Sequence, residues 1–566
     1  MKVSFPFVIF YFITIFCSDY STAQILPKPE SKLNYTQVLF KHPPYKNASY
    51  YKFYLSELDS INAKESISTK IVTDSTSITI INDFNFGKSY KWHVVAFNYK
   101  GKKLNKSKVF QFSILKNDYG DTSRYRVKQF YNEKNSYQNG IIWLDKYCSA
   151  LDRNGKIVWQ FPRSVKTSFS PDNMVDLHMC NNGNITLSFD TCIYYISKDL
   201  EVIWKKNVSD LKNTLKVSYI HHVFTQLPNG NFLALASTYE KFKLNETDTT
   251  RYKYENHIIL EFDENGKLIW NWEMRHHFDM GLIKSHLKKY GSRNSKMDVM
   301  LHANSLAYDS TYNHLFMGFR DFNRFIKIDR KTGNVIGEYG QKLTDTDTNV
   351  FETNFFSKQH DVKPIGPNTI LLFNNGEDDA KSISSVQILK LPTSRSEKVE
   401  KIWEMDLTID SLPGKAVKYG SVQKLSNGNF LIGGGMNGRI LEVTADKKPV
   451  WDLYLQGRMM TIFKWGIFAQ YRAYFNSSLY PYYFSLQLKD KNLYLHNEGT
   501  DKDQYLIETF STSDYQSTLP KKTITTNFIN PNTNFIYELD LNDTKIVKVT
   551  SLQAKTVEVI NLTSGK

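Results

Sequence analysis

The chain of 566 residues is longer than one ordinary hydrophobic core supports, so we expect two or three domains. Its 41% hydrophobic and 14% aromatic residues exclude a disordered chain and favour half-buried β surfaces over helices. The net charge is +15 at pH 7, but the lysines are spread along the chain and no basic stretch is interleaved with aromatic residues. We therefore expect no nucleic-acid partner and only a modest preference for anionic ligands.

The first 23 residues have the features of a secretory signal peptide. Lys2 precedes an apolar run over residues 5–16, and small residues lie just before Gln24, where we expect cleavage. The apolar run is too short to cross a bilayer. An alternative is a lipid anchor on Cys17, which the bulky residues before it disfavour. We expect a periplasmic or secreted protein without a stable membrane span.

Three cysteines remain after this cleavage: Cys148, Cys180 and Cys192. An oxidising compartment permits one disulfide and leaves one thiol over, and the spacing does not assign the pair. The three cysteines do not have CxxC or Cys/His spacing, so we expect no metal ion.

Residues 24–116 alternate between apolar and polar side chains. The alternation is strict from Tyr90 to Asn98 and recurs from Tyr50 to Leu55. This pattern resembles the later strands of a fibronectin type III sandwich, and we expect a β-sandwich here. The resemblance concerns fold only.

Residues 117–485 repeat one unit, in which an Asn-Gly turn leads into a strand that closes on tryptophan. The repeat is clearest from Leu151 to Trp159 and from Phe262 to Trp270. Looser copies end at Trp204, Trp403 and Trp451. Six such units predict an all-β fold built on a six-bladed β-propeller. Residues 486–566 are also strand-rich and form either a small β domain or strands that buttress the ring.

Histidines recur in the segments just before the Asn-Gly turns, which are the expected innermost strands. Four of the six units supply them, as His178, His221, His222, His302 and His360. Imidazole can attack as a nucleophile, carry protons near neutral pH or bind a metal ion. The recurrence favours a functional site at the centre of the ring over five separate structural histidines.

Three motifs carry a family resemblance. His302-Ala303-Asn304 within residues 298–309, then Gly318-Phe319-Arg320, then Gln359-His360-Asp361 followed by residues 371–376, resemble the arylsulfate sulfotransferase family. The resemblance covers roughly residues 120–485. It implies an N-terminal β-sandwich on a six-bladed propeller.

The resemblance also implies a reaction without a nucleotide or other cofactor. A histidine takes the sulfuryl group from a phenolic sulfate ester, forms a sulfohistidine and passes the group to a phenol acceptor. Donors aimed at the sulfuryl and leaving oxygens lower such a barrier. The implied catalytic residues are His302, His360 and His222, and the implied substrate-binding residues are Arg320, Asn304, His221 and Lys381.

Two departures from the family pattern leave alternatives open. The sixth unit reads Gly433 to Gly438 without the family's nucleophilic histidine, and Lys381 is the nearest cation where the fifth unit lacks its arginine. Either another histidine, such as His222 or His360, is the nucleophile, or the reaction is lost. In the second case the protein is a non-catalytic extracytoplasmic propeller that binds an anionic ligand or glycan. A quinone-dependent dehydrogenase is a third class, disfavoured because the chain has no evident acidic calcium site or vicinal cysteines.

Overall fold

A computed structural model describes residues 25–562, apart from residues 46, 59–65, 75, 83, 119–124, 163–173, 292–297, 345–346, 378–381, 413, 459–464, 490 and 542. The expected signal peptide, residues 1–23, and Lys381 lie outside the described residues. Strands greatly outnumber helices in the described residues, which confirms the all-β prediction. No helix in this part of the chain is long and apolar enough to cross a membrane.

The N-terminal residues form two sheets that share an aromatic core. Phe40 of the smaller sheet packs edge-on against Trp92 of the larger one, with ring centroids 5.1 Å apart, and also contacts Phe53 and Phe112. The alternation from Tyr90 onward therefore buries one face of its strand, as the period of two predicts. The strands are β2 (Val38–Lys41) and β5 (Ile78–Ile81) in one sheet, and β1 (Ser31–Leu33), β8 (Phe110–Ile114), β6 (Ser89–Phe97), β3 (Tyr50–Leu58) and β4 (Ser66–Asp74) in the other, with β7 (Lys103–Lys106) beside β6.

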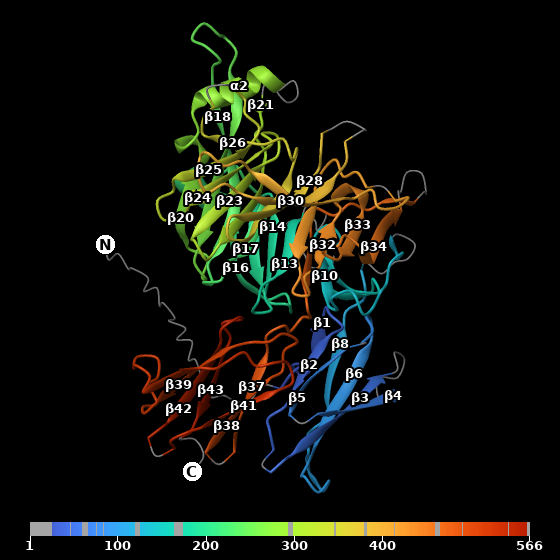
Figure 1. The fold of residues 1–566 in the computed structure, drawn as a ribbon. Coiled ribbons are helices and arrows are strands. Elements are labelled where there is room, and N and C mark those ends of the chain that lie inside the picture. The colour runs from blue at the N-terminus through green and yellow to red at the C-terminus, as the bar shows by residue number, and fades with distance from the viewer. Residues whose placement is uncertain are drawn as a thin grey trace, which may run out of the picture.

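Six further sheets follow along the chain and fill the upper part of Figure 1. The first three contain β10 (Ile141–Leu144), β11 (Ser149–Asp152) and β12 (Ile157–Gln160) with β36 (Ala473–Asn476); β13 (Met174–Met179), β14 (Ile185–Phe189), β15 (Cys192–Ile196) and β16 (Val202–Asn207); and β17 (Tyr219–Gln226), β18 (Phe232–Phe242), β19 (Tyr252–Phe262) and β20 (Leu268–Glu273) with β21 (Asp298–Val299). The next three contain β22 (Ala303–Asp309), β23 (His314–Phe319), β24 (Arg324–Asp329), β25 (Val335–Gly340) and β26 (Val350–Glu352); β27 (His360–Gly366), β28 (Thr369–Asn374), β29 (Ser385–Lys390) and β30 (Glu400–Asp406); and β31 (Ser421–Lys424), β32 (Phe430–Gly433), β33 (Arg439–Val443), β34 (Pro449–Arg458) and β35 (Trp465–Ile467) with β9 (Tyr125–Lys128). The helices are α1 (Val208–Leu215) and α2 (Met280–Tyr290), with short 3₁₀ turns at Met274–His276 and Gly435–Asn437.

The Asn-Gly turns have the geometry that their sequence predicts. Asp152 accepts hydrogen bonds from two backbone N–H groups of its turn, at 2.9 and 2.8 Å, and Asp263 does the same in the third sheet at 3.0 and 2.8 Å. Gly155 and Gly266 both have φ +78°, a conformation that a residue with a Cβ adopts only with strain. The repeated sequence thus produces the same turn twice.

Tryptophans near the ends of four of the six sheets link their sheet to a turn of the next one. The indole N–H groups donate to backbone carbonyls as follows: Trp159 to Lys198 at 2.9 Å, Trp272 to Gly333 at 2.9 Å, Trp403 to Ala445 at 2.9 Å, and Trp451 to Arg153 at 2.7 Å. In the third sheet this contact belongs to Trp272 and not to Trp270, because Trp272 is the buried member of the pair. The bond from Trp451 runs from the sixth sheet back to the first.

The first strands of successive sheets also contact one another. The contacts run from β10 to β13, then to β17, β22, β27 and β31, and finally to β36. β36 pairs antiparallel with β10, with Phe475 opposite Ile142, so a strand from residue 473 onward completes the sheet that begins at residue 141. The cycle of contacts therefore ends where it started.

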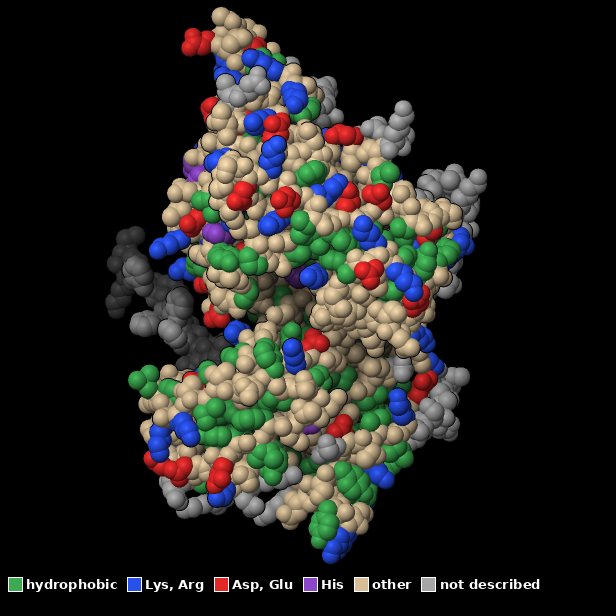
Figure 2. Space-filling view, in the orientation of Figure 1, with side chains coloured by type: hydrophobic (Ala, Val, Ile, Leu, Met, Phe, Trp, Pro, Cys, Tyr) green, Lys and Arg blue, Asp and Glu red, His purple; other side chains and the backbone are tan. Residues whose placement is uncertain are grey.

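The C-terminal sheets lie beside the N-terminal ones in the lower part of Figure 1. Lys41 and Glu558 form an ion pair of 3.3 Å between them, and a cavity of about 750 Å³ lies along this contact. On the face shown in Figure 2, charges of both signs are interspersed over the upper and lower parts. The strands are β37 (Phe484–Lys489), β38 (Asn492–Asn497) and β41 (Asn534–Glu538) in one sheet, and β40 (Lys522–Thr525), β39 (Tyr505–Phe510), β42 (Ile546–Ser551) and β43 (Val557–Asn561) in the other.

Cys148, Cys180 and Cys192 are all buried and are not joined by a disulfide, so the one that the sequence permits is not formed among them. Burial raises the pKa of Cys180 to about 12 and that of Cys192 to about 11. Both thiols therefore stay protonated and unreactive near neutral pH.

A buried histidine cluster as the candidate functional site

In three of the sheets, the first strand carries a β-bulge at or next to a predicted histidine. The pairing register shifts after His221 in β17, after Ala303 in β22 and after His360 in β27. His222 and His302 have φ +61° and +56°, a left-handed conformation that costs a non-glycine residue about 1 to 3 kcal/mol. Bulges of this kind often re-aim side chains next to functional sites.

The side chains of His222 and His360 contact Tyr471, and His302 contacts His222. The ring centroids of His222 and His302 are 5.3 Å apart. Tyr471 lies 5.4 Å from His222, 6.0 Å from His360 and 5.0 Å from Tyr419. Residues at the edges of several sheets thus form one cluster.

His360 is held in one tautomer by Asn375. The Nδ2 group of Asn375 donates to the carbonyl oxygens of Ala416 and Tyr419, at 2.7 and 2.8 Å, so its Oδ1 faces Nδ1 of His360 at 2.6 Å. Nδ1 also lies 3.1 Å from the carbonyl oxygen of Lys358 and must carry the proton. Burial lowers the pKa of His360 to about 3. The ring is therefore neutral near pH 7, with a lone pair on Nε2.

His302 belongs to a charged group at the edge of the cluster. Its Nδ1 lies 3.5 Å from Oδ2 of Asp321, while Oδ1 of Asp321 accepts a 2.5 Å hydrogen bond from Arg320 and lies 3.8 Å from Nζ of Lys358. Burial opposes ionisation of Asp321, but bonding to His302 and these positive charges hold its pKa well below the usual range. Asp321 is thus an anion that orients both His302 and Arg320.

His222 is backed by a second layer of polar side chains. Nδ1 of His221 lies 2.5 Å from Nδ1 of His222, and Nε2 of His221 lies 2.6 Å from Oγ of Ser237. The same hydroxyl lies 2.8 Å from Nδ1 of His257. Burial is the main cause that lowers the pKa of His221 to about 3 and the pKa values of His222 and His257 well below the usual range. All three rings are neutral near pH 7.

Tyr471 and Arg472 are site residues that the sequence did not reveal. Arg472 donates to the carbonyl oxygens of His222 at 2.7 Å and Asn304 at 3.1 Å, and its guanidinium lies 3.6 Å from Asp176. The backbone N–H groups of both residues donate to Asp145 at 3.0 Å. Only the topology could have indicated these two residues. If the chain closes on its first sheet, the residues just before the closing strand lie at the same ends of the first strands as the histidines.

Other predicted residues lie elsewhere or serve the framework. Asn304 is fully buried and its Nδ2 donates to the carbonyl oxygen of Gln359 at 2.8 Å, which joins two sheets. Lys381 is outside the described residues. A cation does lie beside the fifth sheet: Nζ of Lys415 donates to the carbonyl oxygens of Asn375 at 3.0 Å and Glu377 at 2.6 Å.

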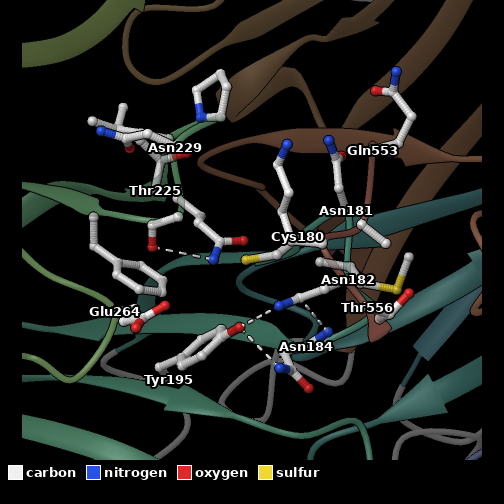
Figure 3. A pocket seen from close by; sticks show the side chains of 18 of the residues that line it. Cys180, Asn181, Asn182, Asn184, Tyr195, Thr225, Asn229, Glu264, Gln553 and Thr556 are labelled. Carbon is white, nitrogen blue, oxygen red and sulfur yellow. Dashed lines mark hydrogen bonds between the residues drawn. The ribbon is translucent and has the colours of Figure 1, made fainter. Parts of the chain in front are cut away.

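His178 also lies outside the cluster. Its ring contacts the hydroxyls of Thr186 and Thr225 at 3.2 to 3.3 Å, and it lines a separate cavity of about 730 Å³. That cavity lies at the Asn-Gly turns and is also lined by Gln553 and Thr556 of the C-terminal residues (Figure 3). The histidine cluster lies at the opposite ends of the first strands.

In this all-β chain, histidines from three neighbouring sheets form one cluster at the starts of their first strands. The family model for arylsulfotransferase (ASST) matches residues 127–439, more than half of the chain. The chain therefore belongs to the arylsulfotransferase family.

No curated protein matches the chain. Similar solved structures include a protein of unknown function from Bacteroides caccae, with 13% identity over 56% of this chain and 93% of that chain and a TM-score of 0.36. Kuenenia stuttgartiensis hydrazine synthase has 9% identity over 54% and 97% of the two chains and a TM-score of 0.28. A putative exported protein from Bacteroides fragilis has 10% identity over 61% and 98% and a TM-score of 0.27. At these scores the similarities support no conclusion about this chain.

Proposed function

We propose that this protein moves a sulfuryl group from a phenolic sulfate ester to a phenol acceptor, with His360 as the nucleophile. The observation that carries this proposal is the tautomer of His360, whose Nδ1–H is bound by Asn375 while Nε2 keeps its lone pair. Membership of the arylsulfotransferase family supports the reaction class. Of the two histidines open as nucleophile, His360 is the one whose hydrogen bonds leave Nε2 unprotonated.

In the first step, Nε2 of His360 attacks the sulfur atom. The N–S bond forms as the S–O bond to the aryl group breaks, and the electron pair leaves with the phenolate. The ring becomes a cation carrying a sulfonate, and its Nδ1–H continues to donate to Asn375. In the second step, the oxygen of an acceptor phenol attacks sulfur, the N–S bond breaks and His360 is restored.

His302 is placed to act as the general acid and base for the phenolic oxygens. Its Nδ1 faces Asp321, so its Nε2 can give a proton to the leaving phenolate and take one from the acceptor. Arg320, bound to the same carboxylate, adds positive charge near the sulfuryl oxygens. His222 is a donor to those oxygens.

We propose that the six sheets are the blades of a β-propeller spanning residues 117–485. The cyclic contacts of the first strands and the bond from Trp451 to Arg153 support this arrangement. The two N-terminal sheets support a fibronectin type III-like sandwich over residues 24–116, and residues 486–566 are a C-terminal extension. The apolar leader supports a periplasmic or secreted location.

The test is a two-substrate assay with an intact-mass measurement. Purified protein is given an aryl sulfate that releases a coloured phenolate, with and without a phenol acceptor. We expect turnover that depends on the acceptor and, without it, a mass increase of one sulfuryl group. The His360→Ala variant should lose both, while the matched control His178→Ala should keep both. A folded protein without turnover or adduct across a panel of aryl sulfates would refute the proposal.

A non-catalytic anion-binding protein is the second candidate. The sixth sheet supports it, because Gly435–Asn437 forms a 3₁₀ turn in which Met436 is exposed and no histidine is present. On this alternative, calorimetry would detect aryl sulfate binding that His360→Ala leaves intact, without turnover.

A further inference from the structure

Behind His222 lies a chain of polar contacts drawn from three neighbouring strands. It runs from His222 and His221 in β17, through Ser237 in β18, to His257 in β19. Consecutive contacts measure 2.5, 2.6 and 2.8 Å. The exposed fractions of His221, Ser237 and His257 are 4%, 0% and 0%, so water does not substitute for any of these contacts.

One backbone N–H group determines which atom is the donor in each of these contacts. The N–H of Ala303 donates to Nε2 of His257 at 3.1 Å. Oε2 of Glu255 also faces Nε2 of His257, but at 3.5 Å it is farther away than the backbone nitrogen. Because a backbone N–H is always a donor, Nε2 of a neutral His257 holds the lone pair and Nδ1 carries the proton. The link joins β19 to β22, so it also connects two sheets.

Each later contact then has one possible donor. Nδ1–H of His257 donates to Oγ of Ser237, which leaves the single hydroxyl proton of Ser237 for Nε2 of His221. A neutral His221 consequently carries its own proton on Nδ1 and donates it to Nδ1 of His222. His222 is then left with its proton on Nε2.

We propose that Ser237 and His257 are positioning residues that hold His222 as the Nε2–H tautomer, a hydrogen-bond donor to the sulfuryl oxygens and not a nucleophile. This inference rests on the proposed function for its catalytic consequence. The two histidines that contact Tyr471 are therefore opposite tautomers. Nε2 of His360 has a lone pair, and Nε2 of His222 carries a proton. A donor aimed at developing charge stabilises the transition state without itself being consumed.

A metal ion is the competing use of these side chains. Ligand atoms of His221, Glu255 and His257 lie within 4.8 Å of one another. Both ring nitrogens of His221 and of His257 already have hydrogen-bond partners, however, and a cation on Nε2 of His257 would meet the N–H of Ala303. A backbone N–H cannot turn away, so the geometry favours the hydrogen-bonded chain.

Two isosteric variants of His257 separate its two nitrogens. In His257→Asn, the side-chain N–H₂ takes the place of Nδ1–H and can still donate to Ser237. In His257→Gln, the side-chain oxygen takes the place of Nε2 and still accepts from Ala303, but the donation to Ser237 is lost. The Gln variant keeps the link between sheets, so thermal melts serve as a check that a change at His222 is not caused by unfolding.

The readout is the ¹⁵N spectrum of labelled histidine, with the signals of His222 assigned from a His222→Ala variant. We expect protonated Nε2 in the wild type and in His257→Asn, and mixed tautomers in His257→Gln and Ser237→Ala. With an aryl sulfate, His257→Gln should lose about tenfold in kcat with little change in KM, the equivalent of one hydrogen bond.

Three results would overturn the proposal: a wild-type His222 with its proton on Nδ1, the same tautomer in all variants, or stoichiometric zinc that binds the wild type and not His257→Asn. The spectrum does not depend on turnover. An inactive wild type with the expected spectrum would therefore refute the proposed function and leave the tautomer assignment supported.

Discussion

Oδ1 of Asn375 lies 2.6 Å from Nδ1 of His360, and two backbone carbonyls hold the amide so that it cannot turn over. Reversal of the amide would place its N–H₂ group against a ring N–H and its oxygen against two carbonyl oxygens. This arrangement fixes the proton of His360 on Nδ1 and leaves the lone pair on Nε2, while burial keeps the ring neutral. Asn375 thus orients the ring of His360 and fixes its tautomer, as a carboxylate does for many catalytic histidines. Unlike a carboxylate, it adds no negative charge that would favour the imidazolium.

Replacement of Asn375 by Asp tests this relationship. The carboxylate would face the carbonyl oxygens of Ala416 and Tyr419 and would favour a protonated His360. We expect kcat for sulfuryl transfer to fall about 10- to 100-fold, as for the loss of a hydrogen bond to a charged group.

The neighbouring Asn374 offers a matched control. Its Oδ1 accepts from the N–H groups of Ser357 and Gly376 at 2.9 and 3.0 Å, which an aspartate can also do, and the variant loses the donation from Nδ2 to Oγ of Ser385 at 3.1 Å, on the side away from His360. Asn374→Asp should therefore keep most of the activity. Equal losses in both variants would show that Asn375 matters only for packing.

Buried neutral histidines predict that the free energy of unfolding falls in mild acid. The pKa values of His221 and His360 are about 3, below the value of about 6.5 expected in an unfolded chain. Between these values the unfolded state binds more protons, so stability is greatest above pH 6.5 and decreases as the pH falls towards 3. Each of these histidines should lower the free energy of unfolding at pH 5 by about 2 kcal/mol relative to its value at pH 7.5.

Urea unfolding at pH 7.5 and pH 5 measures this difference. The His360→Gln variant removes one of the buried neutral histidines, so its stability should depend less steeply on pH. His276→Gln, at an exposed histidine, is the control and should retain the wild-type slope. A wild-type slope in His360→Gln would contradict the assignment of a neutral, buried ring.

Arg472 should stabilise the closure of the chain on its first sheet. Its guanidinium lies 3.6 Å from the buried carboxylate of Asp176 and donates to two carbonyl oxygens. Arg472→Met leaves Asp176 without this charge partner and should lower the free energy of unfolding by about 3 to 5 kcal/mol. In an Asp176→Asn background the same change should cost less, which a double-mutant cycle in urea would measure. Additive losses would exclude coupling between the two residues.

The sequence predicted the elements that depend on local pattern. The Asn-Gly turns and alternating strands recur in the structure because Asp152 and Gly155 form their turn from residues within one segment. The histidines of the first strands were found for the same reason, since their place in the unit is a matter of counting from the turn. Three of them, His222, His302 and His360, contact one shared site or its immediate neighbours.

The remaining site residues depend on contacts between distant segments. β36 is four residues long and has no pattern that distinguishes it, so its pairing with β10 across more than 300 residues was not predicted. Ser237 and His257 lie on the second and third strands of their sheet, whereas the recurrence before the Asn-Gly turns points only to residues of the first strands. The repeat ends on Trp270, but Trp272 makes the contact with the next sheet. Both indoles lie on the same strand, and only packing decides which one is buried.

The wrap-around contact of Trp451 should be worth more than the equivalent contact of Trp403. Trp451 is fully buried, donates to the carbonyl oxygen of Arg153 at 2.7 Å and carries the guanidinium of Arg153 above its ring at 4.4 Å. Trp403 is only partly buried, although its indole makes the corresponding bond to Ala445 at 2.9 Å.

Trp451→Ala should lower the free energy of unfolding by about 3 to 5 kcal/mol, as for other fully buried aromatic side chains. Trp403→Ala removes less buried area and should cost about 1 to 2 kcal/mol. Urea denaturation of both variants measures the difference, with Trp403→Ala as the matched control for loss of one indole N–H bond. Equal losses would mean that the sixth sheet gains no additional stability from its contact with the first, and that the ring of sheets is held at its other interfaces.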